Sequence, residues 1–140
     1  MYRLRILLVG KTKESWLEQA LDEYIKRLQH HLTIDFIWAK DDQQLIQLAT
    51  KEDLLICLDS EGQMFDSVQF SSFLLKQFEK GHSRLAIAIG GPEGLPPSLK
   101  SWPVRISLSA MTFTHQIVRL ILLEQIYRAF EIAKGSGYHK

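Results

Sequence analysis

Three short segments carry residue types that suit ligand binding at the end of a β-strand. Leu58–Gly62 reads LDSEG and Ile89–Gly94 reads IGGPEG; each follows an apolar run and combines glycine with an acidic residue. Glycine lets a ligand approach the backbone, and ligands of open α/β sheets bind beyond the carboxyl ends of the strands. The third segment, Leu108–Phe113 (LSAMTF), suits a purine held by backbone groups between aliphatic side chains. We expect the three segments to share one crevice.

Other interpretations of these segments remain open. The glycines after Ile89 match neither GxGxxG nor GxxxxGK[ST], and they equally fit a tight turn. Asp59 follows an apolar run, as does the phosphoacceptor of a receiver domain. However, Gly10 and Lys11 stand where that domain needs an acidic pair to hold magnesium, so Asp59 is more typical of a polar loop residue. The third segment also fits a strand-to-helix connection with Thr114 as N-cap.

Histidine and cysteine provide no pattern of metal binding. None of the five histidines has a second ligand at metal spacing, and the single cysteine, Cys57, lies in an apolar run typical of the core. His115 is either a partner of the third segment or of a substrate, or a partly exposed polar residue. Tyr138, His139 and Lys140 place an aromatic ring, an imidazole and a cation together, a combination that a disordered tail seldom has.

Hydrophobic periodicity predicts alternating strands and helices over the whole chain. We expect strands at 5–9, 33–38, 54–58, 85–89 and 104–108, and helices at 16–28, 43–50, 65–78, 96–101 and 114–134. Such alternation predicts one α/β domain over residues 1–140, with a mostly parallel sheet and helices on both faces.

The last helix is apolar on more than one side, which predicts burial on more than one side. Glu124, Arg128 and Glu131 fall on one face, which we expect to be exposed to solvent. Arg119 falls among leucines instead, so its stem lies along an apolar surface or its guanidinium meets an anion at a buried interface. Because the domain is small, we expect a second subunit to cover part of this helix in a two-fold dimer.

Composition limits the class of protein. Hydrophobic residues make up 46% of the chain and charged residues 24%, and no apolar stretch is long enough to span a membrane. The first apolar run ends in Gly10 and Lys11 rather than a cleavage site, so we expect a soluble cytoplasmic protein. The net charge of +1 gives no general signature of nucleic-acid binding. An RNA partner would therefore be recognised through a local surface patch and through its shape.

Taken together, LDSEG, IGGPEG, ISLSAMTFTHQIVR, LLEQIYRA and the terminal YHK resemble the SPOUT, or α/β-knot, methyltransferase family over essentially the whole chain. Within it, the pseudouridine N3-methyltransferases of large-subunit (23S) ribosomal RNA are especially similar. The resemblance implies a C-terminal trefoil knot, an obligate homodimer and bent S-adenosylmethionine. It also implies a substrate in the assembled ribosome, with no metal and no membrane partner. A catalytically silent RNA-binding dimer is the alternative.

The resemblance also implies roles for particular residues. Arg119, Tyr138 and His139 would be catalytic, with Arg119 near a phosphate or the cofactor and the tail reaching toward the partner's cofactor. His139 would act as general base. Alternatively, the tail would only position the nucleobase, and the proton would be lost to water. His115 and Lys140 would contact substrate. The residues implied to contact the cofactor are Leu58, Gly90, Leu108, Ser109, Ala110, Met111, Thr112 and Phe113.

Overall fold

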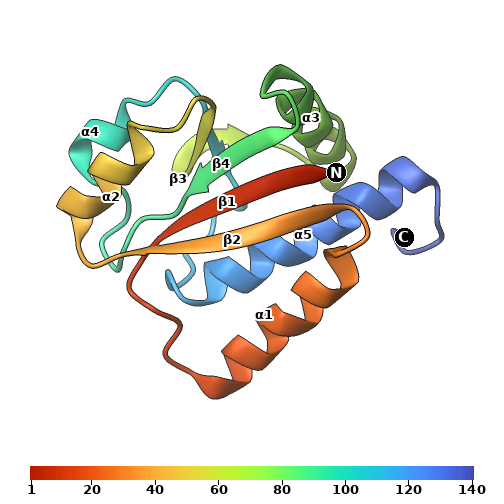
Figure 1. The fold of residues 1–140 in the computed structure, drawn as a ribbon, viewed down its shortest axis with the longest axis horizontal. Helices are drawn as coiled ribbons and strands as arrows, with labels where there is room; N and C mark the ends of the chain where they lie inside the picture. Colours follow the sequence, from red (N-terminus) through yellow and green to blue (C-terminus); the bar gives the residue numbers. More distant parts are fainter.

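Five parallel strands form one sheet in the order β2-β1-β4-β3-β5 in the computed structural model, which describes residues 1–140 (Figure 1). The strands are β1 (Tyr2–Val9), β2 (Leu32–Ala39), β3 (Leu55–Met64), β4 (Arg84–Ala88) and β5 (Arg105–Ser107). Every pairing between neighbours is parallel, so the expected α/β sheet is confirmed. The carboxyl ends of all five strands therefore lie at the same edge.

Helices cover both faces of the sheet. The helices are α1 (Ser15–Leu28), α2 (Asp42–Ala49), α3 (Ser67–Lys80), α4 (Pro97–Lys100) and α5 (Ile117–Lys134). Helices α1, α3 and α5 share a hydrophobic core with Ile6 and Leu8 of β1, whereas α2 and α4 share one with Leu7. Successive side chains of a strand point to opposite faces, which is why one apolar run supplies both cores.

Helix α5 lies between α1 and α3. Tyr127 of α5 meets Tyr24 of α1 edge-to-face at 6.0 Å between ring centroids, and the Ser71 hydroxyl of α3 donates a 2.6 Å hydrogen bond to the Ala129 carbonyl. No residue from Ile117 to the end of the apolar pattern at 132 is exposed, so the expected burial on more than one side is confirmed. None of the helices combines the length and the apolar character that a membrane crossing requires.

Helices α3 and α5 begin two and three residues later than the periodicity predicts, because capping side chains determine where each helix starts. Asp66 and Gln69 form a capping box, which starts α3 at Ser67 rather than at residue 65. Thr114 accepts hydrogen bonds from the backbone N–H of Ile117 at its hydroxyl (3.2 Å) and from that of Val118 at its carbonyl (3.1 Å). Thr114 therefore caps the turn that leads into α5, and the helix itself begins at Ile117.

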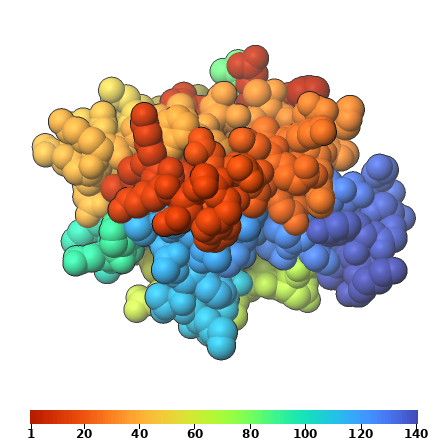
Figure 2. Space-filling view, turned by 90° about the horizontal axis from the view of Figure 1, so that it is seen from below, coloured from red at the N-terminus to blue at the C-terminus, as the bar shows by residue number.

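The predicted solvent face of α5 is wrong in part, because the C-terminal tail covers it. Gly135 ends the helix in the left-handed conformation (φ +76°), and the chain turns back so that the tail packs against one end of the molecule (Figure 2). Glu131 is 9% exposed and accepts a hydrogen bond from the Ser136 hydroxyl (3.0 Å). Arg128 and Glu124, one turn apart on this face, form an ion pair at 3.0 Å.

Candidate functional site

A cavity of about 390 Å³ lies at the carboxyl ends of β4 and β5 and beside the middle of β3. Its walls come from Leu58–Glu61, Ile89–Leu95 and five residues of the segment 108–113, so the predicted shared crevice is confirmed. A cavity of this size lies within the range of small-molecule sites. Of the residues that the resemblance implies for the cofactor, Leu58, Gly90, Leu108, Ser109, Met111, Thr112 and Phe113 line the cavity. Ala110 does not.

The first wall is a bulge in β3 rather than a loop after it. Leu58 and Gln63 both pair with Ile106 of β5, so residues 59–62 protrude from the ladder. Gly62 is required here, because a Cβ atom at this position would lie 2.7 Å from the carbonyl carbon of Arg105. The bulge brings polar side chains to the mouth of the cavity.

Asp59 holds this bulge in place. Its carboxylate accepts a 2.9 Å hydrogen bond from the Arg105 guanidinium and a 3.1 Å hydrogen bond from the Glu61 backbone N–H. The side chain is only 11% exposed and its charge is balanced by Arg105. Asp59 is therefore a structural residue of the bulge rather than the ordinary polar loop residue that the sequence suggested.

The second wall makes a tight turn and also brings backbone to the cavity. The Gly94 N–H donates to the Gly91 carbonyl (2.9 Å), and Gly94 has a positive φ of +85°. A Cβ atom on Gly90 would collide with the backbone of Gly94. The turn and the ligand loop, which the sequence offered as alternatives, are compatible in the same segment.

The third wall is a loop folded on its own serines. The Ser107 hydroxyl donates to the Ser109 carbonyl (2.8 Å), and the Ser109 hydroxyl accepts from the Met111 N–H (3.0 Å). These bonds satisfy part of the irregular backbone and leave Met111 and Phe113 exposed beside the cavity.

His115 lines the same cavity, at the turn before α5. Burial, followed by the positive charges of Arg119 and Lys13, lowers the pKa of this imidazole below its usual value. His115 is therefore neutral at neutral pH, and it can both donate and accept a hydrogen bond. His115 lines the cavity and is also partly exposed, so both interpretations of this residue remain compatible with the structure.

Gln116 is a residue of this region that the sequence did not point to. Its side-chain oxygen accepts from the Lys13 N–H (3.0 Å), and its side-chain nitrogen donates to the Lys11 carbonyl (3.2 Å). The amide thus pairs with the backbone as a neighbouring strand would, and it ties the β1–α1 loop to the start of α5. A glutamine beside a histidine carries no sequence signal for such a role.

Arg119 does not line the cavity, and its guanidinium meets no anion within the chain. The residue is 1% exposed, and its guanidinium donates to the carbonyls of Val9 (3.0 Å) and Gly10 (2.8 Å) and to the Thr12 hydroxyl (3.0 Å). No carboxylate pairs with it, and burial lowers the pKa of the guanidinium. Neutral carbonyls take the place that the sequence suggested for an anion.

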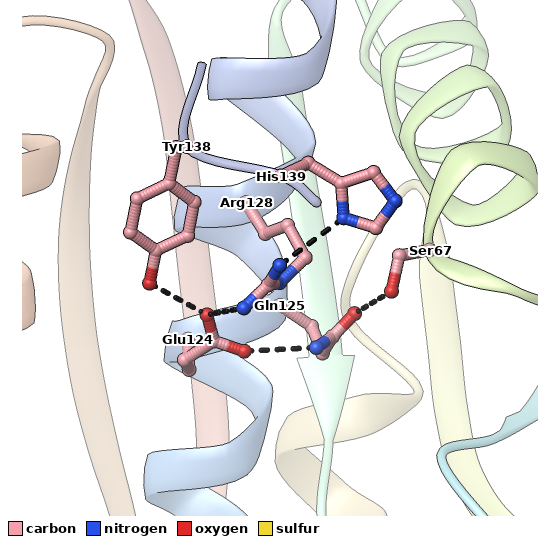
Figure 3. A network of polar contacts seen from close by, with 6 residues as sticks. All are labelled: Ser67, Glu124, Gln125, Arg128, Tyr138 and His139. Carbon is pink, nitrogen blue, oxygen red and sulfur yellow. Dashed lines mark hydrogen bonds and ion pairs between the residues drawn. The ribbon is translucent and has the colours of Figure 1, made fainter. Parts of the chain in front are cut away.

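A polar network joins the C-terminal tail to α5 (Figure 3). The Tyr138 hydroxyl donates to the Glu124 carboxylate (2.9 Å), and Arg128 donates to the same oxygen (3.0 Å). Arg128 also contacts Nδ1 of His139 at 3.1 Å. Burial and the hydrogen bond to Glu124 raise the pKa of the Tyr138 phenol well above its usual value, so the phenol stays protonated.

His139 lines a second cavity, of about 510 Å³, which shares Leu108 and Phe113 with the first. Tyr138 and Lys140 line neither cavity. The two cavities are therefore neighbours, and among the tail residues only His139 lies beside them. No group of three or more histidine, cysteine or acidic side chains is arranged to hold a metal ion.

Comparison with known proteins gives matches over the whole chain. The family described as "Predicted SPOUT methyltransferase" matches residues 2–139. The chain is 59% identical over 140 residues to the ribosomal RNA large subunit methyltransferase H of Protochlamydia amoebophila, with 100% of both chains covered. It is 46% identical over 143 residues to the protein of that name from Prochlorococcus marinus, covering 99% of this chain and 96% of the relative.

Solved structures share the fold at much lower identity. A probable methyltransferase from Bordetella pertussis matches with a TM-score of 0.58 at 9% identity, covering 91% of this chain and 96% of its own. A probable methylase family protein from Haemophilus influenzae matches with a TM-score of 0.55 at 10% identity, covering 99% of this chain and 70% of its own.

Proposed function

The chain belongs to the SPOUT methyltransferase family, and we propose that it methylates N3 of a pseudouridine in large-subunit (23S) ribosomal RNA, using S-adenosylmethionine. The observation that carries this proposal is the convergence of three loops on one cavity. The relatives' shared name supports ribosomal RNA as the substrate.

The cavity fits S-adenosylmethionine in its chemistry. Leu58, Ile89 and Leu108 offer aliphatic surfaces for a purine, and the glycine turn offers backbone groups without a Cβ atom in the way. Glu61 and Glu93 line the cavity without an ion-pair partner, so their charges suit a ligand that carries a sulfonium and an ammonium group.

The protein's task in this reaction is alignment. When bound, S-adenosylmethionine supplies a methyl group already activated by its sulfonium. The three loops hold that group in line with the imide nitrogen, and the neutral His115 orients a polar group of either ligand. We assign Arg119 a positioning role, because it fixes the β1–α1 loop against the start of α5.

Assembly into a two-fold dimer is part of the proposal. Helix α5 keeps partly exposed apolar side chains, and Trp16 on the adjacent helix α1 is 54% exposed. A partner that covers this surface would bring the tail of one protomer toward the cavity of the other. Tyr138, His139 and Lys140 would then complete the site, with Lys140 contacting phosphate.

A trefoil knot in the C-terminal half is also proposed. After β5, at the edge of the sheet, the chain crosses the carboxyl edge and reaches the β1–α1 loop, where Gln116 binds Lys11 and Lys13. The walls formed by β3 and by the β4–α4 loop lie along this path. Threading of the segment between them would give the knot, which a backbone trace from a crystal structure would test.

The assembled ribosome is the proposed substrate. A net charge of +1 provides little general attraction for RNA, so ribosomal surface is expected to supply contacts that a free hairpin lacks. Comparable methylation of free RNA and of ribosomes would contradict this part of the proposal.

Calorimetric titration with S-adenosylmethionine, followed by a methylation assay on ribosomes from cells lacking the gene, tests the function. We expect saturable binding and one added methyl group, which mass spectrometry of the ribosomal RNA places on a pseudouridine. RNA binding without S-adenosylmethionine binding would instead indicate a catalytically silent RNA-binding dimer. Removal of residues 138–140 should lower the single-turnover rate without unfolding the protein.

A further inference from the structure

The contact between Arg128 and His139 determines which nitrogen of the imidazole carries a proton. A guanidinium has only donors, so Nδ1 of His139, at 3.1 Å from it, must accept. A neutral imidazole with an accepting Nδ1 carries its proton on Nε2. His139 is therefore held as the Nε2–H tautomer.

Arg128 is itself held from two sides. Glu124 accepts a hydrogen bond from it at 3.0 Å, and the guanidinium carbon lies 4.9 Å from the centre of the Tyr138 ring. The same Glu124 oxygen accepts from the Tyr138 hydroxyl at 2.9 Å. Tail and helix thus hold the guanidinium between them.

The carboxylate of Glu124 is fixed at both oxygens. Its second oxygen accepts from the side-chain amide of Gln125 (2.8 Å), whose own oxygen accepts from the Ser67 hydroxyl at the start of α3 (2.8 Å). The chain of contacts runs from α3 through α5 to the tail, as Figure 3 shows. Every side chain in this network has a hydrogen-bond partner, although Nε of Arg128 is buried without one, and such shared bonds restrict the side chains to one arrangement.

The surroundings of His139 contain few other charged groups. Asp66 of the α3 capping box lines the same cavity, Arg128 of α5 contacts the imidazole and is itself bonded to Glu124, and Tyr138 and Lys140 flank His139 in the tail. Asp66 is engaged by the Gln69 backbone N–H at 2.7 Å. The hydrogen bond from Arg128 is made at Nδ1 and leaves Nε2 without a partner in this group, on a ring that lines the second cavity.

We propose that His139 acts as a hydrogen-bond donor to the substrate through Nε2–H, and that Glu124 and Arg128 are positioning residues that hold it in this state. This inference rests on the proposed methyl transfer. The network forms within one chain, so it sets the imidazole in the same way whichever protomer's cavity it serves.

The chemistry of an imide explains why a donor is useful. As the N3–H proton leaves for water, negative charge spreads from N3 onto the two neighbouring carbonyl oxygens. The N3 electron pair then forms the new bond to the methyl carbon, and the electrons of the broken S–C bond return to sulfur, leaving a neutral thioether. A donor at one carbonyl stabilises the anion that attacks.

The same geometry argues against His139 as the base. A base needs a free lone pair, whereas Arg128 occupies the lone pair of Nδ1 and the other nitrogen carries the proton. Proton loss to water, which the sequence left as an alternative, is the route that the network favours.

The kinetics of two substitutions at His139 distinguish a hydrogen-bond donor from a general base. Glutamine places an N–H donor near the position of Nε2–H and does not titrate, whereas alanine removes the group. For His139→Gln we expect a single-turnover rate within about 10-fold of the wild type, and for His139→Ala a loss of about 100-fold, the usual cost of removing one such donor. The rate of both variants should follow pH as the wild-type rate does.

A limb of the pH–rate profile that is present in the wild type and absent from His139→Gln, with both variants equally impaired, would overturn the donor role. Loss of the proposed function would look different, because the wild-type protein itself would then fail to bind S-adenosylmethionine or to methylate ribosomes.

The tautomer can be measured without any activity. Two-bond nitrogen–proton correlations of ¹⁵N-histidine protein distinguish a protonated Nε2 from a protonated Nδ1, and His139→Gln identifies the signal by its loss. We expect the Nε2–H form in the wild type and a mixed population in Glu124→Gln. A protonated Nδ1 in the wild type would refute the proposal whatever the enzyme methylates.

Glu124→Gln also has a matched control on the protein surface. Glu23 and Arg27 form a pair of the same i, i+4 spacing on α1, at 2.8 Å and exposed. We expect Glu124→Gln to lower kcat by about 10-fold or more while leaving the affinity for S-adenosylmethionine unchanged, as for loss of a group that acts through a neighbour. Glu23→Gln should change neither; equal effects of the two variants would assign the Glu124 pair a merely structural role.

Discussion

Arg119 donates a 2.8 Å hydrogen bond to the carbonyl oxygen of Gly10, 109 residues earlier in the chain. The contact joins the end of the first strand to the last helix, and the guanidinium bonds two further acceptors beside it. A buried cation without an anionic partner is stable here because backbone and hydroxyl oxygens point toward it.

Replacement of Arg119 by lysine should destabilise the protein. An ammonium group lacks the planar fork that reaches three acceptors, so at least one buried carbonyl loses its donor, at a cost of about 1–3 kcal/mol in the free energy of unfolding. Urea denaturation measures this change. Arg84→Lys, at an exposed cation without an ion pair, is the control and should unfold like the wild type; equal stability of Arg119→Lys would show that the fork is dispensable.

Gly90→Ala should weaken S-adenosylmethionine binding by about 10-fold or more, since 1.4 kcal/mol of lost binding energy corresponds to a factor of ten. The added methyl group collides with the Gly94 backbone, so the turn must move away from its place in the cavity. Gly91→Ala tests the same loop without the collision, because its Cβ atom would only touch Val9 at 3.4 Å. Calorimetric titration compares the two, and equal affinities would argue against the turn as a binding surface.

His115 should make the protein less stable in acid. Its folded-state pKa is lowered, so between that value and the ordinary pKa of about 6.5 the unfolded chain binds a proton that the folded protein does not. The free energy of unfolding therefore falls as the pH drops through this window. His115→Gln should flatten the slope below pH 6.5 in urea denaturation series; an unchanged slope would mean that His115 titrates normally.

Cys57 should resist thiol reagents until the protein unfolds. Burial, followed by the charge of Asp59, raises the pKa of the thiol to about 12, and the side chain is inaccessible. Mass spectrometry after iodoacetamide treatment at pH 8 should find no adduct on the native protein and one adduct per chain in denaturant. Rapid modification of the native protein would show that β3 opens readily.

The positions of the strands could be predicted, because continuous apolar runs such as Leu54–Leu58 and Leu85–Ile89 need burial on both faces of a sheet. Their order could not. Nothing local to β4 indicates that it lies between β1 and β3, since this order depends on how the connections cross.

Much of the cavity could be predicted from residue types, because glycine, acid and hydroxyl residues after apolar runs suit ligand loops at a sheet edge. The partners of long side chains could not. The periodicity of α5 placed Arg119 on a buried side, but its acceptors belong to a loop over a hundred residues away. The helical periodicity placed Glu131 on a face exposed to solvent. It is covered by the tail that turns back after Gly135, which the periodicity of the helix does not describe.

The β3 bulge leaves and rejoins the ladder at a single residue of β5, Ile106. Both ends of the intervening stretch are therefore fixed by strand pairing, and changes in its length need not shift the register of the strands around it. Such a stretch is a natural place to exchange sequence between related enzymes, with Gly62 retained for its tight approach to Arg105. Swapping it would alter ligand preference while the scaffold stayed intact.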